Sequence, residues 1–425
     1  MYDTGSTAFM LVCTMLVLFM TPGLAFFYGG LARRKNVVNT MLMCFVVIGV
    51  VGIAWVLAGW SFAYGGDGSL SWFGGFDQLG LAGLVTNMLA EAESVPADTV
   101  YPTLLDVCFQ MAFAMITAAI VTGSVAGRMR FGAIVAFIAV WSLVVYAPLA
   151  HMVWGGEGSL IGDVIGALDF AGGDVVHISS GVTGLILCLF LGGRKGFGLK
   201  SYRPHNVPFV ALGAGLLWLG WFGFNGGSEF AADEIAALAI LNTVVSSAAG
   251  LVSWLVTERV ATGKPTLVGA CTGLVAGLVV VTPGAGFVEP WAAALMGIIV
   301  APVCYLAISK LKARFGYDDA LDAFGCHGVG GILGGVLTGL FCVPELSWTE
   351  AGGLLYTGDA SLLVSQVVGI LVTLAIVIVL DLVLVAAVRA AFGGSLRVSE
   401  HDEALGLDVS AHGESAYPAF TGLDA

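Results

Sequence analysis

The fold is decided by one stretch of sequence, Asp169-Phe170-Ala171-Gly172-Gly173-Asp174-Val175-Val176-His177. A second stretch, Asp319-Ala320-Leu321-Asp322-Ala323-Phe324-Gly325-Cys326-His327, repeats the spacing of eight residues from Asp to His. Each His lies well inside a long apolar run of the chain. A single spacing of this kind would mean little, whereas two in corresponding places indicate a chain built from two related halves.

The composition places these stretches in a membrane. The chain has 425 residues and a net charge of −13, and it is 58% hydrophobic but only 11% charged, with a mean hydropathy of +0.96. Because soluble domains carry about 25% charged residues, this composition excludes a soluble globular enzyme. It also excludes a disordered chain and a nucleic-acid binder, which would need a basic face. The sequence therefore predicts an all-α polytopic membrane protein.

The apolar runs can be counted as membrane spans. A spanning helix needs about 20 mostly apolar residues. This criterion predicts eleven spans, at residues 7–31, 38–64, 101–126, 131–154, 171–192, 207–225, 232–257, 266–283, 290–309, 323–342 and 361–388. We expect residues 1–392 to form a transmembrane domain and residues 393–425 a cytoplasmic tail.

The basic residues orient the predicted bundle. All 16 lie in alternate connections or after the last span: Arg33, Arg34, Lys35, Arg128, Arg130, Arg194, Lys195, Lys200, Arg203, Arg259, Lys264, Lys310, Lys312, Arg314, Arg389 and Arg397. Cytoplasmic loops are the ones that carry excess Lys and Arg. The N-terminus is therefore predicted outside and the C-terminus in the cytoplasm.

The two Asp–His stretches enter the membrane from opposite faces. Asp169 begins an inward-running span and Asp319 precedes an outward-running one, so about 12 Å of helix carries each His towards the middle of a ~30 Å core. Spans one to five and six to ten are then inverted repeats, and such repeats place their site at the interface between them. The long eleventh span falls outside this symmetry.

Two adjacent imidazoles cannot both carry a charge in a medium of low dielectric constant. We expect one Nδ1 to donate to the other, which leaves the Nε2 atoms facing a lumen. The alternative is a structural His bonded to a backbone carbonyl. A zinc site is disfavoured because no third intramembrane ligand is evident. The eight cysteines occur singly, so we expect them to be small packing residues and expect no metal site or cofactor.

Aromatic residues cluster towards the outer ends of the same spans. Phe113 lies in the third span, Trp154 closes the fourth, and Phe224 and Ser228 close the sixth. Interfacial aromatics are usually lipid anchors, but the polar Asn225 and Ser228 beside them favour a vestibule. Such a vestibule suits a small cation that donates hydrogen bonds. The apolar tube beyond cannot replace the hydration shell of K⁺ or Na⁺, so a cation that can lose its proton is favoured.

These motifs resemble the ammonium transporter (Amt/MEP/Rh) family, and in particular its bacterial and archaeal Amt branch. The matching stretches run almost from end to end of the chain: residues 21–30, 150–156, 167–177, 220–228 and 324–328. The family resemblance implies a transporter for ammonium and methylammonium that forms a homotrimer in the lipid bilayer of the cell (inner, cytoplasmic) membrane, with one pore per subunit.

The resemblance also implies a role for each aromatic residue at the outer end. Phe113, Trp154 and Ser228 would form the ammonium-recruiting site. Phe113 and Phe224 would stack as a gate below it, with Trp221 lining the pore.

Deeper in the membrane, the resemblance assigns His177 and His327 as the twin histidines of the pore. Asp169 would be the supporting carboxylate that shapes the recruiting site or assists deprotonation, and Asp319 its counterpart in the other half. No cofactor and no nucleic-acid partner is implied.

The end of the chain resembles the family's cytoplasmic tail. The matching segments are residues 396–400, 406–408 and 412–417. In the family this tail packs across neighbouring subunits and couples to PII (GlnK-type) signalling proteins. Ser395 stands where a Gly is common. Asp381 lies inside the last span with no partner four residues away; either it faces a neighbouring helix or the helix projects into the cytoplasm at this point.

Ammonium uptake is the favoured function, with NH₃ passing the lumen and the proton carried separately. A passive NH₃ channel and an ammonium sensor that reports to PII proteins remain alternatives. A sodium-coupled transporter of another solute should show unwound helices with polar ligands, which the sequence barely offers. An enzyme is not expected, because no nucleophile–base set lies at membrane depth.

Overall fold

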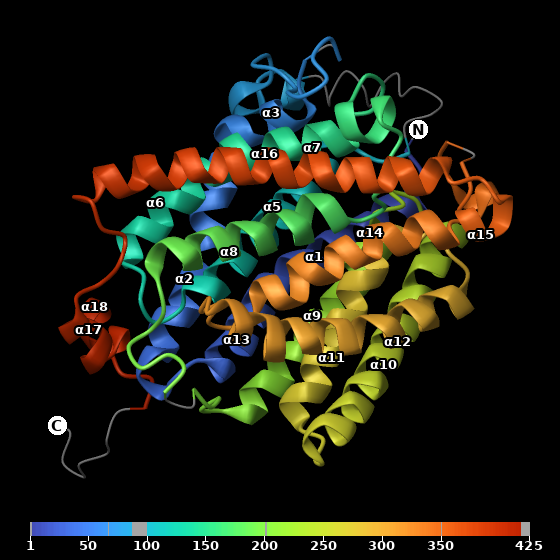
Figure 1. Cartoon of the computed structure of the whole chain (residues 1–425). Helices are drawn as coiled ribbons and strands as arrows, with labels where there is room; N and C mark the ends of the chain where they lie inside the picture. Colours follow the sequence, from blue (N-terminus) through green and yellow to red (C-terminus); the bar gives the residue numbers. More distant parts are fainter. Residues whose placement is uncertain (1, 67, 87–99, 200–201, 350, 418–425) are drawn as a thin grey trace.

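The computed structural model describes residues 2–66, 68–86, 100–199, 202–349 and 351–417 (Figure 1). Within this part of the chain eleven helices are long and apolar enough to cross a membrane, and no β-strand forms. The predicted all-α bundle of eleven spans is thereby confirmed. Lys200 and the end of the predicted tail, residues 418–425, lie outside the described residues.

The first half of the bundle comprises five spans. Their elements are α1 (Thr4–Leu31); α2 (Val37–Ala54), η2 (Trp55–Gly59) and α3 (Trp60–Tyr64), preceded by η1 (Arg34–Asn36); α5 (Thr103–Val125); α6 (Phe131–Trp141), η4 (Ser142–Tyr146) and α7 (Ala147–Trp154); and η6 (Gly173–Ile178) with α8 (Ser179–Leu191). We call the end of the bundle where α1 begins the outer end, after the predicted orientation, and its connections add η3 (Leu79–Leu81) and η5 (Leu160–Val164).

The second half repeats this arrangement and is followed by the eleventh span. Its elements are α9 (Val207–Gly227); α10 (Glu234–Thr262); α11 (Leu267–Val281) with η7 (Thr282–Gly284); α12 (Pro290–Leu306), η8 (Ala307–Leu311) and α13 (Lys312–Phe315); and η9 (Phe324–Gly328) with α14 (Val329–Phe341). After η10 (Pro344–Leu346) and α15 (Leu354–Thr357) come α16 (Ser361–Ala391), α17 (Glu400–Leu405) and α18 (Leu407–His412).

The predicted end of the ninth span needs correction. The ninth span was predicted to end at residue 309, but the helix continues to Phe315, so Lys310, Lys312 and Arg314 lie on its last turns rather than in a connection. The physical reason is that a helix can extend beyond the apolar core, where charged side chains reach water while the backbone stays hydrogen-bonded.

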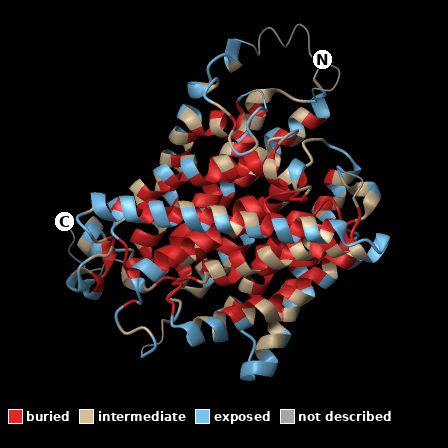
Figure 2. Cartoon of the chain, turned by 45° about the horizontal axis from the view of Figure 1, so that its top comes forward, coloured by how far each residue is buried: buried red, intermediate tan, exposed pale blue. Residues whose placement is uncertain are grey.

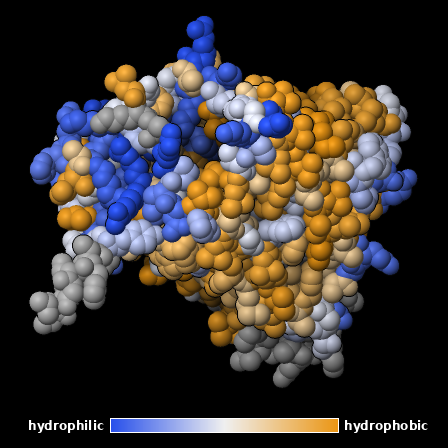
Figure 3. Space-filling view, turned by 90° about the horizontal axis from the view of Figure 1, so that it is seen from below, coloured by the Kyte–Doolittle hydropathy of each residue, from blue (hydrophilic) through white to orange (hydrophobic). Residues whose placement is uncertain are grey.

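Apolar residues surround most of these helices because one side meets protein and the other side meets lipid. On α1, for example, Met10 and Val17 are fully buried, whereas Met15 is 61% exposed. Figure 3 shows the result, a broad hydrophobic surface flanked by hydrophilic residues. The interior is filled by buried residues from nearly every helix (Figure 2).

The two halves meet through the first helix of each, α1 and α9. A Cβ added to Gly213 of α9 would lie 2.6 Å from Cα of Phe27 on α1, so the two backbones are in contact. Small residues allow this approach in a membrane, where lipid supplies no hydrophobic drive for helix association.

The long helix α16 lies across the outside of the bundle (Figure 1). Its inner face carries buried polar residues, among them Gln366, which accepts a hydrogen bond from the backbone N–H of Leu168 at 2.5 Å. Asp381 also belongs to this face and is fully buried. It faces Trp141 and Thr183, which bond each other at 3.0 Å, so Asp381 packs against neighbouring helices of the bundle.

The start of α1 and the helices α17 and α18 lie at opposite ends of the bundle, as an odd number of spans requires (Figure 1). Helices α17 and α18 fold back beneath the ends of α2 and α8. Glu403 accepts hydrogen bonds from Arg397 and from the backbone N–H of Lys195, both at 2.6 Å. Asp408 accepts from the backbone N–H of Asn39 at 2.9 Å.

The expectation for the cysteines was wrong at one position. Seven of the eight are buried packing residues, but Cys108 on α5 is exposed. Its neighbours in sequence, Val107 and Phe109, are buried. The side chain therefore lies on the outer face of a helix whose other faces are packed.

Candidate functional site

Both Asp–His stretches fold into the same local structure. In each, the Asp lies in a turn just before a π-helical segment, and the His lies within that segment: His177 in η6 and His327 in η9. π-Helical turns are rare and occur often at functional sites. The repeat in the sequence is therefore a repeat in conformation.

The carboxylate of Asp169 accounts for the outer turn. It accepts hydrogen bonds from the backbone N–H groups of Gly172, Gly173, Asp174 and Val175, at 2.6 to 3.4 Å. The chain reaches this geometry through Gly172, whose φ of 114° belongs to the left-handed region that favours glycine. Asp169 thus satisfies N–H groups that no helical partner could.

Asp319 caps the corresponding turn in the other half. It accepts from the backbone N–H groups of Ala323, Phe324 and Gly325 at 2.8 to 3.4 Å, and from the Ser124 hydroxyl at 2.7 Å. Both carboxylates are almost completely buried, with exposures of 2% for Asp169 and 1% for Asp319. This local structure explains the spacing of eight residues from Asp to His, which covers the turn that the carboxylate caps and the first residues of the π-helical segment.

The two histidines meet at the crossing of these spans. Nδ1 of His177 and Nδ1 of His327 are 3.2 Å apart, and the ring centroids are 5.2 Å apart. One Nδ1 must donate and the other accept, since two donors or two acceptors would repel. Among the described residues Nε2 of His177 has no hydrogen-bond partner.

Glycines let the two histidine-bearing spans approach this closely. A Cβ added to Gly181 would lie 2.6 Å from Cα of Gly328, and one added to Gly331 would lie 3.0 Å from Cβ of His177. Any larger residue at Gly181 would push the two backbones apart. The distance between the histidines is therefore set by a backbone contact.

Aromatic rings cover the histidines on the outer side. Phe113 and Phe224 stack with centroids 4.1 Å apart and planes 15° apart. His177 stacks in turn on Phe224 at 6.1 Å and on Trp221 at 5.5 Å. The indole of Trp221 is held by a 3.0 Å hydrogen bond to the Thr282 hydroxyl.

A small apolar cavity lies between these rings and the histidines. Its volume is about 10 Å³, and His177, His327, Trp221 and Phe224 are among its lining residues. A cavity of this size holds about one water-sized molecule. A hydrated metal ion does not fit there.

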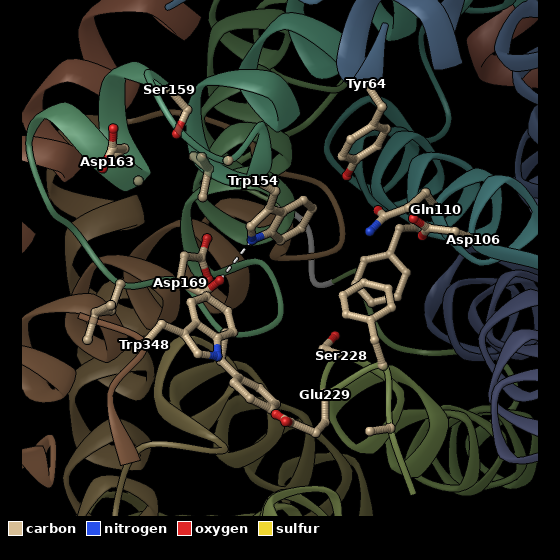
Figure 4. Close-up of a pocket in the computed structure, with 18 of the residues that line it drawn as sticks. Tyr64, Asp106, Gln110, Trp154, Ser159, Asp163, Asp169, Ser228, Glu229 and Trp348 are labelled. Carbon is tan, nitrogen blue, oxygen red and sulfur yellow. Dashed lines mark hydrogen bonds between the residues drawn. The ribbon is translucent and has the colours of Figure 1, made fainter. Parts of the chain in front are cut away.

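Outside the phenylalanine pair the molecule opens into a large cavity of about 740 Å³ (Figure 4). Phe113, Trp154 and Ser228 all line it. The Trp154 indole donates to the backbone carbonyl of Asp169 at 2.8 Å and meets Phe113 edge to face at 6.1 Å. The Ser228 hydroxyl donates to the carbonyl of Phe224 at 2.8 Å. The structure thus brings all the residues predicted for recruitment into one cavity.

Several polar residues of this cavity were not predicted from the sequence, among them Tyr64, Asp106, Gln110 and Glu229. A signal was available for two of them, because Asp106 and Gln110 are four residues apart on the helix that carries Phe113. Burial and the nearby charge of Asp233 raise the pKa of Glu229 to about 7.

The opposite end of the bundle is closed by ion pairs instead. Arg194 binds Asp318 with two side-chain hydrogen bonds of 2.7 and 2.8 Å, and the pair is nearly inaccessible to solvent. Burial would raise the pKa of Asp318, but hydrogen bonds from Arg194 and its charge hold it below the ordinary value. Lys312 and Asp322 form a second pair at 2.7 Å. Within the described ranges no three His, Cys, Asp or Glu residues gather as metal ligands.

Comparison with known proteins agrees with this architecture. A family model described as Ammonium Transporter Family matches residues 8–417. An ammonium transporter of Aquifex aeolicus is 48% identical over 421 residues, which are 98% of this chain and 94% of that protein. An ammonium transporter of Bacillus subtilis is 46% identical over 413 residues, covering 97% of this chain and 98% of that protein.

Solved structures show the same fold. A crystal structure of Saccharomyces cerevisiae Mep2 gives a TM-score of 0.85 at 31% identity, covering 94% of this chain and 88% of that one. A structure titled Sensor Amt Protein gives 0.86 at 26% identity, with coverages of 96% and 98%. The relatives are membrane transport proteins rather than enzymes. With a match over nearly its whole length and relatives above 40% identity, the chain belongs to the ammonium transporter family.

Proposed function

We propose that this protein takes up ammonium and methylammonium by binding the cation in the outer cavity, removing a proton and conducting the neutral amine past the histidines. The observation that carries the proposal is the His177–His327 contact directly beneath the Phe113–Phe224 stack. Below the stack, a cation would meet aromatic rings, imidazoles and apolar side chains, and none of the described residues that line the small cavity is a carboxylate.

Recruitment uses aromatic rings and one hydroxyl. Trp154 and Phe113 line the cavity, and cations are attracted to the faces of such rings. Asp169 fixes Trp154 through its backbone carbonyl. Its carboxylate is saturated by N–H donors, which favours a role in shaping the recruiting site over a role as the base that takes the proton.

Deprotonation follows from the change of surroundings. Moving from the wide cavity into the 10 Å³ pocket strips water from the cation, and desolvation disfavours its charged form. The neutral amine can then donate or accept hydrogen bonds with the imidazole Nε2 atoms. K⁺ has no proton to lose and pays the full desolvation cost, so it is rejected.

The proton that the cation loses passes separately over the His177–His327 pair and internal water in this proposal, so that uptake carries net charge. Ammonium pulses applied to liposomes containing the protein should give a transient current. A passive NH₃ channel would instead give ammonia flux without current, and that result would exclude the electrogenic version.

The histidine pair is tested by the variant His177→Leu/His327→Leu. Loss of both imidazoles should lower methylammonium flux or weaken the rejection of K⁺, because the lumen loses its hydrogen-bonding groups. Uptake with and without excess K⁺ measures both effects. If neither quantity changed, the histidines would be structural.

We further propose a homotrimer in the cytoplasmic membrane, with the N-terminus outside and residues 393–425 as a regulatory tail for PII (GlnK-type) proteins. The tail's contacts with Lys195 and Asn39 support such coupling. The likeness to a protein titled Sensor Amt keeps a sensing role as a second candidate. Cells with a transport-dead pore variant would distinguish the two, since a sensor would still control growth.

A further inference from the structure

A polar face of α5 leads from the outer cavity to the phenylalanine stack. Asp106, Gln110 and Phe113 are spaced by four and three residues, which places them on one side of the helix. Asp106 lies about 10 Å of helix rise further out than Phe113. Anything that enters towards the stack along this face passes the two polar side chains first.

Three polar atoms at this level have no hydrogen-bond partner among the described residues. They are Oδ1 of Asp106, Oε1 of Gln110 and the hydroxyl oxygen of Tyr64, and each atom is buried. Gln110 as a whole is only 5% exposed. Figure 4 shows the three side chains gathered on one side of the cavity, across from Trp154.

Such atoms are unusual, since most buried polar groups in proteins are hydrogen-bonded. Two other carboxylates of the cavity wall differ: Asp163 accepts from the backbone N–H of Gly158 at 2.7 Å, and Asp169 is saturated. Glu229 also has a buried oxygen without a partner among the described residues, but it lies beside Ser228 and not on α5. No Lys or Arg is among the described residues that line the cavity. Asp106 lies in the first turn of α5, where the helix dipole favours a negative charge.

We propose that Asp106, Gln110 and Tyr64 form a binding site for a small monovalent cation with N–H donors, ammonium or methylammonium, outside the aromatic recruiting site. This inference rests on the proposed function and names an earlier step in it. A carboxylate, an amide oxygen and a phenol oxygen offer acceptors to several N–H groups of one cation. They offer too few oxygens for Ca²⁺, which takes six to eight.

The site would increase the capture of the cation in the outer cavity and would not change the rate at which the amine passes the pore. A negative group in a partly enclosed mouth raises the local concentration of cations. Its loss should therefore raise KM and leave Vmax unchanged, because the stack, the histidines and the pocket remain intact.

The test is methylammonium uptake into liposomes by the full-length protein and four variants. Asp106→Asn should raise KM about tenfold, the effect of one lost charge-assisted bond. Gln110→Met, of similar shape, should raise KM severalfold, and Asp106→Glu should restore most of the affinity. Glu345→Gln is the matched control, since it removes one exposed charge from an outer connection and Glu345 is not among the residues that line the cavity.

Two results would overturn the site. One is a KM for Asp106→Asn equal to that of Glu345→Gln, and the other is a lower Vmax at unchanged KM. If the wild-type protein took up no methylammonium, the proposed function would fail instead. Calorimetric titration of the purified protein with methylammonium would then test the binding site independently of transport. Loss of binding in both Asp106→Asn and Gln110→Met supports the site, and binding equal to that of the wild-type protein overturns it.

Discussion

The outer and inner ends of the molecule are built on the same Asp-capped turn but treat their charges in opposite ways. At the outer end, Asp106 and Glu229 each have a buried oxygen with no partner, around an open cavity. At the inner end, Asp318, Asp322 and Glu403 are all paired with Arg or Lys. All four ion pairs found in the described part of the chain lie at this inner end.

This difference indicates that both halves use the same capped turn as a scaffold, whereas the charged residues around each turn determine what that end of the molecule does. The same carboxylate-capped turn supports a wide mouth where no basic residue is near, and a sealed, cross-linked end where basic residues are plentiful. Unpaired carboxylates attract a cation, whereas paired ones stabilise the fold. The three predictions below test this contrast, from the largest expected effect to the smallest.

Replacing the two capping carboxylates, one at a time, should give the largest difference in methylammonium uptake between the outer and inner ends. Asp169→Ala should abolish methylammonium uptake, because it frees up to four buried N–H groups and releases the loop that holds Trp154, at about 1–3 kcal/mol per unmet group. Asp319→Ala should retain measurable uptake, since Lys312 still binds the carbonyl of residue 319 at 2.6 Å. Uptake normalised to protein in the membrane measures both.

The contrast would break if Asp319→Ala were as inactive as Asp169→Ala. Normal uptake by Asp169→Ala would refute its assigned role altogether. A fluorescence-detected elution profile of each variant serves as the control for folding.

Breaking the inner ion pairs should lower stability and leave affinity unchanged. Asp318→Asn leaves the buried Arg194 without its partner and should cost about 3–5 kcal/mol, whereas the more exposed Asp322 should cost about 1 kcal/mol. Thermal unfolding in detergent measures the order. Because the pKa of Asp318 is lowered in the folded state, its contribution is complete above the ordinary Asp pKa and is lost as the pH falls below that value.

A KM for Asp318→Asn that differed from that of the wild-type protein would contradict this assignment. It would mean that the inner end takes part in capture. The variant Asp322→Asn provides the matched control, because it removes a pair at the same end.

Glu229 should give the smallest effect, a pH dependence of capture. Its pKa of about 7 means that the side chain is neutral below this pH and anionic above it. The KM for methylammonium should therefore fall about two- to threefold from pH 6 to pH 8, as one more negative charge faces the cavity. In Glu229→Gln this change should be smaller. An identical pH profile in both proteins would assign the dependence to another group.

Much of this architecture could be predicted because lipid imposes simple rules on sequence. The spans follow from apolar runs, since every backbone polar group in the membrane must be bonded within its own helix. The meeting of His177 and His327 follows from two Asp–His spacings that run in opposite directions. The helix ends were less predictable, as α13 illustrates, because charged turns can continue a helix beyond the apolar core.

The outer cavity was only partly predictable for a different reason. Phe113, Trp154 and Ser228 belong to recognisable stretches, but Tyr64, Asp106 and Gln110 come together from two spans whose relative rotation no local pattern encodes. The same holds for Asp381, whose neighbours Trp141 and Thr183 depend on how α16 lies against the bundle. Such contacts require the packed structure.

The glycine crossing of the histidine-bearing spans has a consequence for how cargo moves. Gly181 and Gly328 bring two backbones into contact, and packed backbones cannot slide past each other without a clash or a void. We therefore expect this crossing to stay fixed during transport, rather than to let the halves rock so that the pore faces the two sides in turn. Unlabelled methylammonium loaded inside vesicles should accordingly fail to accelerate entry of the labelled compound, because no carrier has to return empty.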